Sequence, residues 1–292
     1  MAAGTSSVID LLTASLSQLE KSLVFHPGSL VESHTVVQVS GLDSIEVPVA
    51  LGRYLVGALA GAVGLDAQLF EDLLARGVDR REEIRGTVNR LIGPDNVFTG
   101  PKQILMRDTR RNAWIGEGVG HALLTLSAHK VTSCVDGQVC TLTEIHQTPN
   151  RQGLDSVSTY VQNNVLGVGI GESKATRAAA SENLTDAAGL FIEVEEGIHG
   201  PDLRARLAAF RFVLDPGLKD QVKDSLWTDN ASYLPIVVFQ ENFDVTAKRP
   251  KLAQLKQPAQ RRRVIVVQLP DFHGFFDAVA DAMRAAVDEV IL

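Results

Sequence analysis

The chain of 292 residues is about twice the usual size of a domain, so it has room for one large domain or for a domain with a sizeable appendage. Hydrophobic residues make up 45% of it and charged residues 22%, proportions that exclude an intrinsically disordered protein. The formal net charge of −7 argues weakly against nucleic acid as a partner, unless positive charge is concentrated in one segment.

The start of the chain and its most apolar stretch give no sign of secretion or of membrane insertion. Residues Met1 to Ser7 are small and polar, unlike a secretory signal. The stretch from Val47 to Leu65 is interrupted by Pro48 and Arg53, so it predicts a buried helix near residues 54–63 and not a membrane span. No membrane partner is therefore expected.

The cysteine content points in the same direction. Only Cys134 and Cys140 are present, and with no secretory context they are expected to be reduced core thiols. Together with His129 they make a poor metal site, because the spacing fits no familiar zinc pattern. A cytoplasmic protein is the expectation.

The first hundred residues have the pattern of a mainly helical region. Apolar residues recur at spacings of three and four from Val8 to Leu23, and Ser7 with Asp10 resembles a helix start. Further elements are expected as a strand at Thr35 to Val39 and helices near Tyr54 to Val63, Asp66 to Leu74 and Glu82 to Leu91. The loop between Pro94 and Pro101 is the expected boundary between an accessory region, residues 1–100, and a catalytic region, residues 101–292.

From Ile115 onward the pattern becomes an alternation of helices and strands. A helix at Gly116 to His129 is followed by three segments of strand-like composition, Cys140 to His146, Leu154 to Val161 and Val165 to Ser173, with turns at Pro149-Asn150 and residues 162–164. Next come helices at Ala175 to Val194 and Pro201 to Val213, strands at Tyr233 to Gln240 and Arg263 to Leu269, and an amphipathic C-terminal helix. This order predicts an α/β sandwich with a mixed central sheet flanked by helices.

Three residues in this region have the spacing of a phosphodiester-cleaving site. Asp155 follows Gly-Leu, and an apolar strand ends in Gly-Glu-Ser-Lys, which contains Glu172 and Lys174. An acid near the start of one strand can meet an acid near the end of the next, because neighbouring strands lie about 5 Å apart. Glu172 and Lys174 differ by two positions and share a face of their strand. Two carboxylates and one amine are therefore expected to converge.

That grouping suits metal-assisted hydrolysis. Mg²⁺ prefers oxygen ligands, and Asp155 and Glu172 with a backbone carbonyl, such as that of Ser173, leave positions for water and a phosphate oxygen. A bound Mg²⁺ or Mn²⁺ polarises the phosphate and lowers the pKa of the attacking water. Lys174 can offset the charge that grows on the phosphorus centre.

Glu117 is a candidate fourth member, because it lies on the helix that precedes the strands. A carboxylate on the helix face that meets the sheet is costly unless it is paired or bound to metal. His121 lies one turn further along the same face, but a lone histidine near a helix core is more often a hydrogen-bonded structural residue.

These motifs carry a resemblance. An acid on a helix, Gly153-Leu154-Asp155 and a strand ending in Gly171-Glu172-Ser173-Lys174 resemble the PD-(D/E)XK nuclease superfamily, although Leu154 replaces the proline of the name. With Ile115-Gly116-Glu117-Gly118, they resemble more narrowly the HamA family, the nuclease subunits of Hachiman antiphage defence systems. The resemblance implies a restriction-endonuclease-like core, Mg²⁺ held by the three acids, DNA as substrate and a HamB-like helicase partner that restrains the nuclease.

One segment concentrates positive charge in this acidic chain. Seven basic residues occur with no acid among them: Lys248, Arg249, Lys251, Lys256, Arg261, Arg262 and Arg263. Such a block is a candidate surface for DNA phosphates, and the alternative is a solvated loop that aids solubility.

Other interpretations of these residues remain open. Gly167, Gly169 and Gly171 could cradle a phosphate, although G-x-G-x-G is not the dinucleotide pattern and the chain has no G-x-x-x-x-G-K-[ST] sequence. Glu144 and His146 could join the site, but solvent-facing strand residues are the favoured interpretation. At the level of function, the alternative is a catalytically silent DNA-binding or regulatory subunit, whose acids form ion pairs only.

Overall fold

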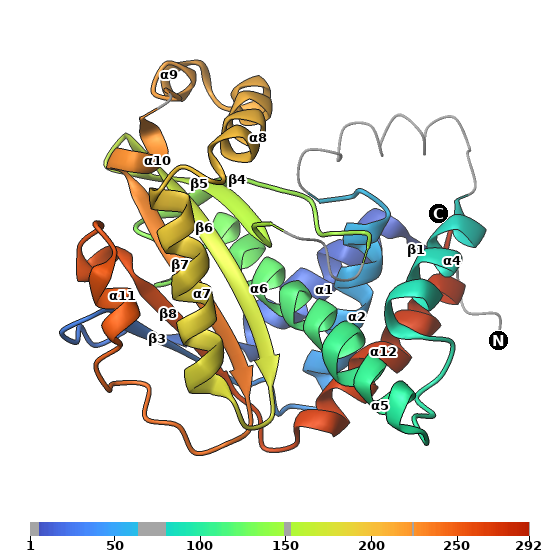
Figure 1. Ribbon diagram of the computed structural model, residues 1–292. Helices are drawn as coiled ribbons and strands as arrows, with labels where there is room; N and C mark the ends of the chain where they lie inside the picture. Colours follow the sequence, from blue (N-terminus) through green and yellow to red (C-terminus); the bar gives the residue numbers. More distant parts are fainter. Residues whose placement is uncertain (1–5, 64–79, 149–152, 224, 292) are drawn as a thin grey trace.

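A seven-stranded mixed sheet lies between two layers of helices in the computed structural model, which describes residues 6–63, 80–148, 153–223 and 225–291 (Figure 1). Its strands are β2 (Val24–His26), β3 (Thr35–Ser40), β4 (Gln138–Leu142), β5 (Ser156–Gln162), β6 (Val165–Thr176), β7 (Ala231–Phe239) and β8 (Arg263–Gln268). Their order across the sheet is β2-β3-β8-β7-β6-β5-β4. The predicted α/β architecture with a mixed central sheet is thereby confirmed.

The sheet changes from antiparallel to parallel at β6. The strands β4, β5 and β6 form an antiparallel meander, whereas β6, β7, β8 and β3 run parallel to one another. The short β2 adds an antiparallel edge next to β3. Every position of β7 is buried, as expected for a parallel strand that helices cover on both faces.

Each face of the sheet has its own hydrophobic core. Ile236 and Val238 of β7 belong to the core beneath α1 (Val8–Ser22), α2 (Glu46–Leu59), α6 (Asn112–His129) and α12 (Phe272–Glu289). Tyr233 and Val237 of the same strand belong to the other core, beneath α7 (Ala180–Glu195) and α8 (Gly200–Val213). The two sets alternate along the strand, because successive side chains point to opposite faces.

The remaining elements are short or peripheral. They are α4 (Arg81–Ile92), α5 (Pro101–Met106), the π-helix η2 (Arg107–Arg111), α9 (Pro216–Lys219), α10 (Leu226–Asp229), α11 (Pro250–Gln254), the 3₁₀ turn η3 (Ala259–Arg261) and a parallel pair formed by β1 (Ser6–Ser7) and β9 (Val290–Ile291). None of the helices in these described ranges is long and apolar enough to cross a membrane.

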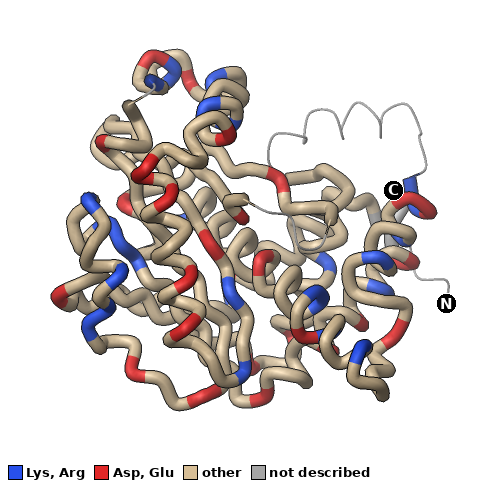
Figure 2. The backbone as a smooth tube through the Cα atoms, in the orientation of Figure 1, with Lys and Arg blue, Asp and Glu red and all other residues tan. Residues whose placement is uncertain are grey.

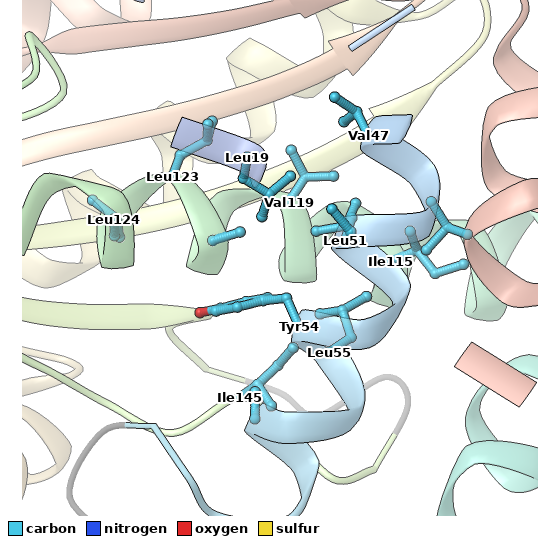
Figure 3. Close-up of a cluster of buried hydrophobic side chains, with 14 of the residues drawn as sticks. Leu19, Val47, Leu51, Tyr54, Leu55, Ile115, Val119, Leu123, Leu124 and Ile145 are labelled. Atoms are coloured by element: carbon cyan, nitrogen blue, oxygen red, sulfur yellow. The ribbon is translucent and has the colours of Figure 1, made fainter. Parts of the chain in front are cut away.

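The described part of the first hundred residues contains α1, α2 and α4 together with β2 and β3, and it shares a core with the rest of the chain. Leu19 of α1, Leu55 of α2 and Leu123 of α6 belong to one buried cluster (Figure 3). In addition, β3 pairs in parallel with β8, over Thr35–Arg263 to Val39–Val267. The loop near residue 100 therefore does not coincide with a break in the hydrophobic core.

Several element boundaries differ from the sequence prediction. Helix α2 begins at Glu46, earlier than predicted. Pro48 does not prevent this start, because it lies in the first turn, where proline is tolerated. Strand β6 extends to Thr176, since it pairs with β7 as far as Phe239, and α7 begins only at Ala180. The strand expected at Cys140 to His146 ends at Leu142 and continues as a loop. The expected helix at 66–74 and the turn at 149–150 lie outside the described residues.

Candidate metal centre

Asp155 and Glu172 lie opposite each other on the same face of the sheet. The last register pair of β5 and β6 at this end joins Ser156 to Gly171, and Asp155 and Glu172 are the next residues on the two chains. Residues that are directly opposite in an antiparallel pair project to the same side. The position of Asp155 is fixed further by the main-chain N–H of Ser173, which donates to its Oδ2 at 2.7 Å.

Lys174 follows on the same face and pairs with Glu172. Its Nζ lies 2.7 Å from Glu172 Oε1. Glu172 is only 6% exposed, and its second oxygen, Oε2, is buried with no hydrogen-bond partner in the part of the chain that the structure describes. A buried carboxylate oxygen without a partner is costly, so this atom is poised for a ligand that supplies positive charge.

Glu117 reaches the site because two glycines let α6 lie directly on β6. A Cβ on Gly116 would meet the Cβ of Ala175 at 2.8 Å, and one on Gly120 would meet the Oγ of Ser173 at 2.3 Å. The side chain of Ser173 thus faces α6, and only its main chain contributes to the site. The close approach of the helix brings the half-buried Glu117 to the start of β5, beside Asp155.

His146 completes the group, although the sequence favoured a solvent-facing position for it. That interpretation is wrong, because β4 ends at Leu142 and His146 is buried in the following loop. Its Nδ1 lies 3.5 Å from Glu117 Oε2. One ligand atom each from Glu117, His146 and Asp155 lie within 4.8 Å of one another. No pattern in the sequence predicts the position of His146 beside Glu117 and Asp155, because this position depends on the path of a loop.

His121 has the structural role that was favoured for a lone histidine. Its Nε2 donates to the carbonyl of Thr143 at 2.9 Å, and its Nδ1 accepts from the hydroxyl of Tyr54 at 2.6 Å. Burial lowers the pKa of His121 to about 4, so the ring is neutral. His121 therefore links α2, α6 and the loop after β4, and Glu117 is the residue of α6 that belongs to the site.

The site brings together more acidic groups than basic ones, which favours the protonated form of its acids. Burial raises the pKa of Glu117 to about 8, and the nearby Glu172 adds to the shift while Lys174 opposes it. Burial likewise raises the pKa of Asp155 well above its usual range, reinforced by Glu172 and Glu117 and opposed by the Ser173 N–H. For Lys174, burial opposes the charge, but Glu172 and Asp155 hold its pKa above the ordinary value. One ammonium group thus faces three acids.

These acids line a cavity of about 630 Å³ between α6, β6 and α7. Its lining is largely polar and includes Asp108, Thr109, Glu172, Lys174, Asn183 and His199. The donor set of two or three carboxylates and one imidazole, with an unpartnered buried oxygen at Glu172, fits a divalent cation. The coarse expectation of a metal site at these residues is consistent with that arrangement.

The basic segment follows α11 and the start of β8, beside α7 (Figure 2). Arg262 is buried and donates to the carbonyls of Gln257, Ser33 and Leu255, and Arg263 donates to the carbonyl of Ser133 and pairs with Asp136. Both guanidinium groups join loops to the sheet; Arg262 is buried, which corrects its assignment to a phosphate-binding surface, whereas Arg263 is partly exposed.

The other five basic residues of the segment are exposed or partly buried. Lys248 pairs with Glu32, Arg249 lies over the ring of Phe243 and donates to Ser181, and Arg261 donates to the carbonyl of Asp229. Lys251 and Lys256 are exposed. These two lysines retain the chemistry expected of a phosphate-binding surface.

The glycines of β6 have a packing role. Cβ atoms on Gly167, Gly169 and Gly171 would meet the ring of Tyr160 and the hydroxyls of Ser158 and Ser156, each at 2.6 Å or closer. They therefore lie within a paired strand and form no phosphate-binding loop. Cys134 and Cys140 are free, as expected, but only Cys134 is buried.

Comparison with known proteins adds no assignment. No family model matches the sequence, and no curated protein matches it.

Proposed function

We propose that this protein is a divalent-metal-dependent nuclease with Asp155, Glu172, Lys174 and Glu117 as its catalytic residues. The observation that carries the proposal is the position of Asp155 directly opposite Glu172 on the same face of adjacent strands, with Lys174 two residues further along. Glu117, on α6, lines the same cavity as these three residues. Glu172 is buried, and Asp155 and Glu117 are partly buried.

The three acids would hold Mg²⁺ or Mn²⁺, and the bound cation would polarise a phosphodiester and lower the pKa of a water molecule. Asp155 is oriented for this role by the N–H of Ser173, which fixes one of its oxygens. Lys174 is held by Glu172, so its ammonium group is available to stabilise negative charge on the phosphate oxygens.

The order of elements supports the finer assignment. The succession α6, β4, β5, β6, α7, β7 places one acid on the first helix, one at the start of β5 and one in β6. This is the arrangement that the resemblance to PD-(D/E)XK nucleases implies. On that basis we assign DNA as the substrate, antiphage defence in the cytoplasm as the setting, and Lys251 and Lys256 as contacts to DNA phosphates.

Digestion of defined DNA tests the proposal. Linear, nicked and circular DNA would be incubated with the purified chain in Mg²⁺, in Mn²⁺ and in EDTA, together with Glu172→Gln. Glu193→Gln is a matched control, because Glu193 lines the same cavity from α7 and pairs with His199. We expect metal-dependent cleavage that Glu172→Gln abolishes and Glu193→Gln retains. Absence of cleavage and of metal binding would favour a silent DNA-binding or regulatory subunit.

The proposed partner is a HamB-like helicase that restrains the nuclease. Glu172→Ala and Lys174→Ala should leave partner binding intact, because Glu172 is buried, Lys174 is partly buried and both line the cavity. Co-purification of the wild-type chain with the helicase encoded beside it is the measurement. Full, unregulated activity of the isolated chain, with no helicase recovered, would contradict the restraint and leave the nuclease assignment standing.

A further inference from the structure

The loop after β4 carries His146 into the acidic group and is anchored on both sides. Ile145 is 5% exposed and lies beside Tyr54 and Leu55 of α2 (Figure 3). The main-chain carbonyl of His146 accepts from Trp114 Nε1 at 2.7 Å. Because Ile145 is packed in the core and Trp114 holds the next carbonyl, the imidazole of His146 has a defined position.

The imidazole lies beside two acidic side chains. The Nδ1 of His146 lies 3.5 Å from Glu117 Oε2, and one ring nitrogen of His146 belongs to the set with Glu117 and Asp155 whose ligand atoms all lie within 4.8 Å of one another. The three residues come from α6, the loop after β4 and the start of β5, so three separate elements converge. A second, independent observation points to a ligand next to this group: the buried Oε2 of Glu172, which lines one cavity together with Glu117 and Asp155, has no hydrogen-bond partner among the described residues.

We propose that His146 is a nitrogen ligand of the bound cation, so that the centre selects first-row transition-metal dications such as Mn²⁺ over Mg²⁺. Mg²⁺ demands hard oxygen ligands in near-ideal octahedral geometry and gains little from an imidazole. Transition-metal dications bind imidazole nitrogen more readily. The inference rests on the proposed function only in that both place a cation at this site.

The alternative is a plain ion pair between a protonated His146 and Glu117. The two arrangements differ in what faces a bound ion. An ion pair leaves the Nδ1 proton between the two side chains and keeps the nitrogen away from the metal, whereas a ligand presents its lone pair to the metal. Only the second arrangement gives a magnetic coupling between the metal and a ring nitrogen.

Pulsed electron paramagnetic resonance of the Mn²⁺-loaded full chain distinguishes them. We expect ¹⁴N modulation from a coordinated imidazole in the wild type, its loss in His146→Gln and its retention in His199→Gln. His199 lines the cavity that Glu117 and Asp155 line but pairs with Glu193, so its substitution is the matched control. Since Trp114 binds the main chain of residue 146, the glutamine variant keeps that anchor.

Binding titrations add a second readout. In His146→Gln the affinity for Mn²⁺ should fall at least about tenfold, while the affinity for Mg²⁺ changes much less, so the preference between the two ions falls. Absence of ¹⁴N coupling in the wild type, or an unchanged preference in the variant, would overturn the inference. If the coupling is found and no DNA is cleaved, the inference stands and the proposed function fails. If DNA is cleaved and the coupling is absent, the proposed function stands and the inference fails.

Discussion

Replacement of Glu117 by glutamine should stabilise the metal-free protein at alkaline pH. Burial raises the pKa of Glu117 from 4.5 to about 8, so the folded protein retains a proton that the unfolded chain has lost. Where the folded state binds more protons, the free energy of unfolding falls as pH rises. The loss begins near pH 4.5 and is complete once the pH passes about 8. A neutral amide at this position removes that contribution.

The magnitude follows from the size of the shift. A shift from 4.5 to about 8 corresponds to at most about 5 kcal/mol at 1.36 kcal/mol for each pKa unit. Relaxation of the site and entry of water reduce this, so we expect Glu117→Gln to exceed the wild type by about 2–5 kcal/mol at pH 8.5. At pH 5 the two proteins should agree within about 1 kcal/mol.

Urea denaturation in EDTA, followed by tryptophan fluorescence at pH 5, 6, 7 and 8.5, measures the difference. The wild type should lose stability steadily over this range, with a contribution from Asp155, whose pKa burial also raises. Glu193→Gln is the control, and its profile should follow the wild type. The reasoning is refuted if wild-type stability is flat between pH 5 and 8.5, or if Glu117→Gln is the less stable protein at pH 8.5.

Three further predictions concern metal binding, the packing of α6 on β6 and the basic segment. Mn²⁺ at one hundred times its dissociation constant should stabilise the wild type by about 2.7 kcal/mol. A thermal-shift titration should show tighter binding at pH 8.5 than at pH 6, because protons compete for Glu117 and Asp155, and should show no shift for Asp155→Asn. Gly120→Val should displace α6 from β6, so it should lower the free energy of unfolding by about 1–3 kcal/mol in urea denaturation and weaken Mn²⁺ binding. The control Gly86→Ala has nothing within 4 Å of its new methyl group and should be neutral or stabilising. Equal effects of the two substitutions would contradict the packing argument. Arg262→Ala should lower the free energy of unfolding by about 2–4 kcal/mol, because three hydrogen bonds are lost. Lys256→Ala should leave the free energy of unfolding unchanged and flatten the salt dependence of DNA binding. The reverse pattern would indicate that Arg262 contacts DNA.

The periodicity of the sequence was sufficient to predict the order of elements around the site. The apolar run from Val165 and the two-residue spacing of Glu172 and Lys174 predicted one strand with both side chains on one face, and β6 has that arrangement. The gap between Asp155 and Glu172 predicted two adjacent strands, and the register places the two acids opposite each other. These relations are local, so strand geometry alone determines them.

Contacts that depend on the path of a loop or on the partner of a charge were not predictable. The position of His146 depends on a hydrogen bond from Trp114, 32 residues away in the sequence. The burial of Arg262 depends on carbonyls at Ser33 and Leu255, which only the folded sheet brings together. A run of basic residues therefore gives the net charge of a segment, whereas the fold decides which of its members reach solvent.

The position of Mn²⁺ in crystals of the full chain, located by anomalous scattering, tests the metal centre most directly. We predict an ion in the cavity between α6, β6 and α7, with oxygens of Glu117, Asp155 and Glu172 and a ring nitrogen of His146 within about 2.5 Å of it. Crystals of Asp155→Asn grown in the same solution should lack this ion. A wild-type crystal with Mn²⁺ bound elsewhere, and with these side chains in contact only with one another, would contradict the proposed metal centre.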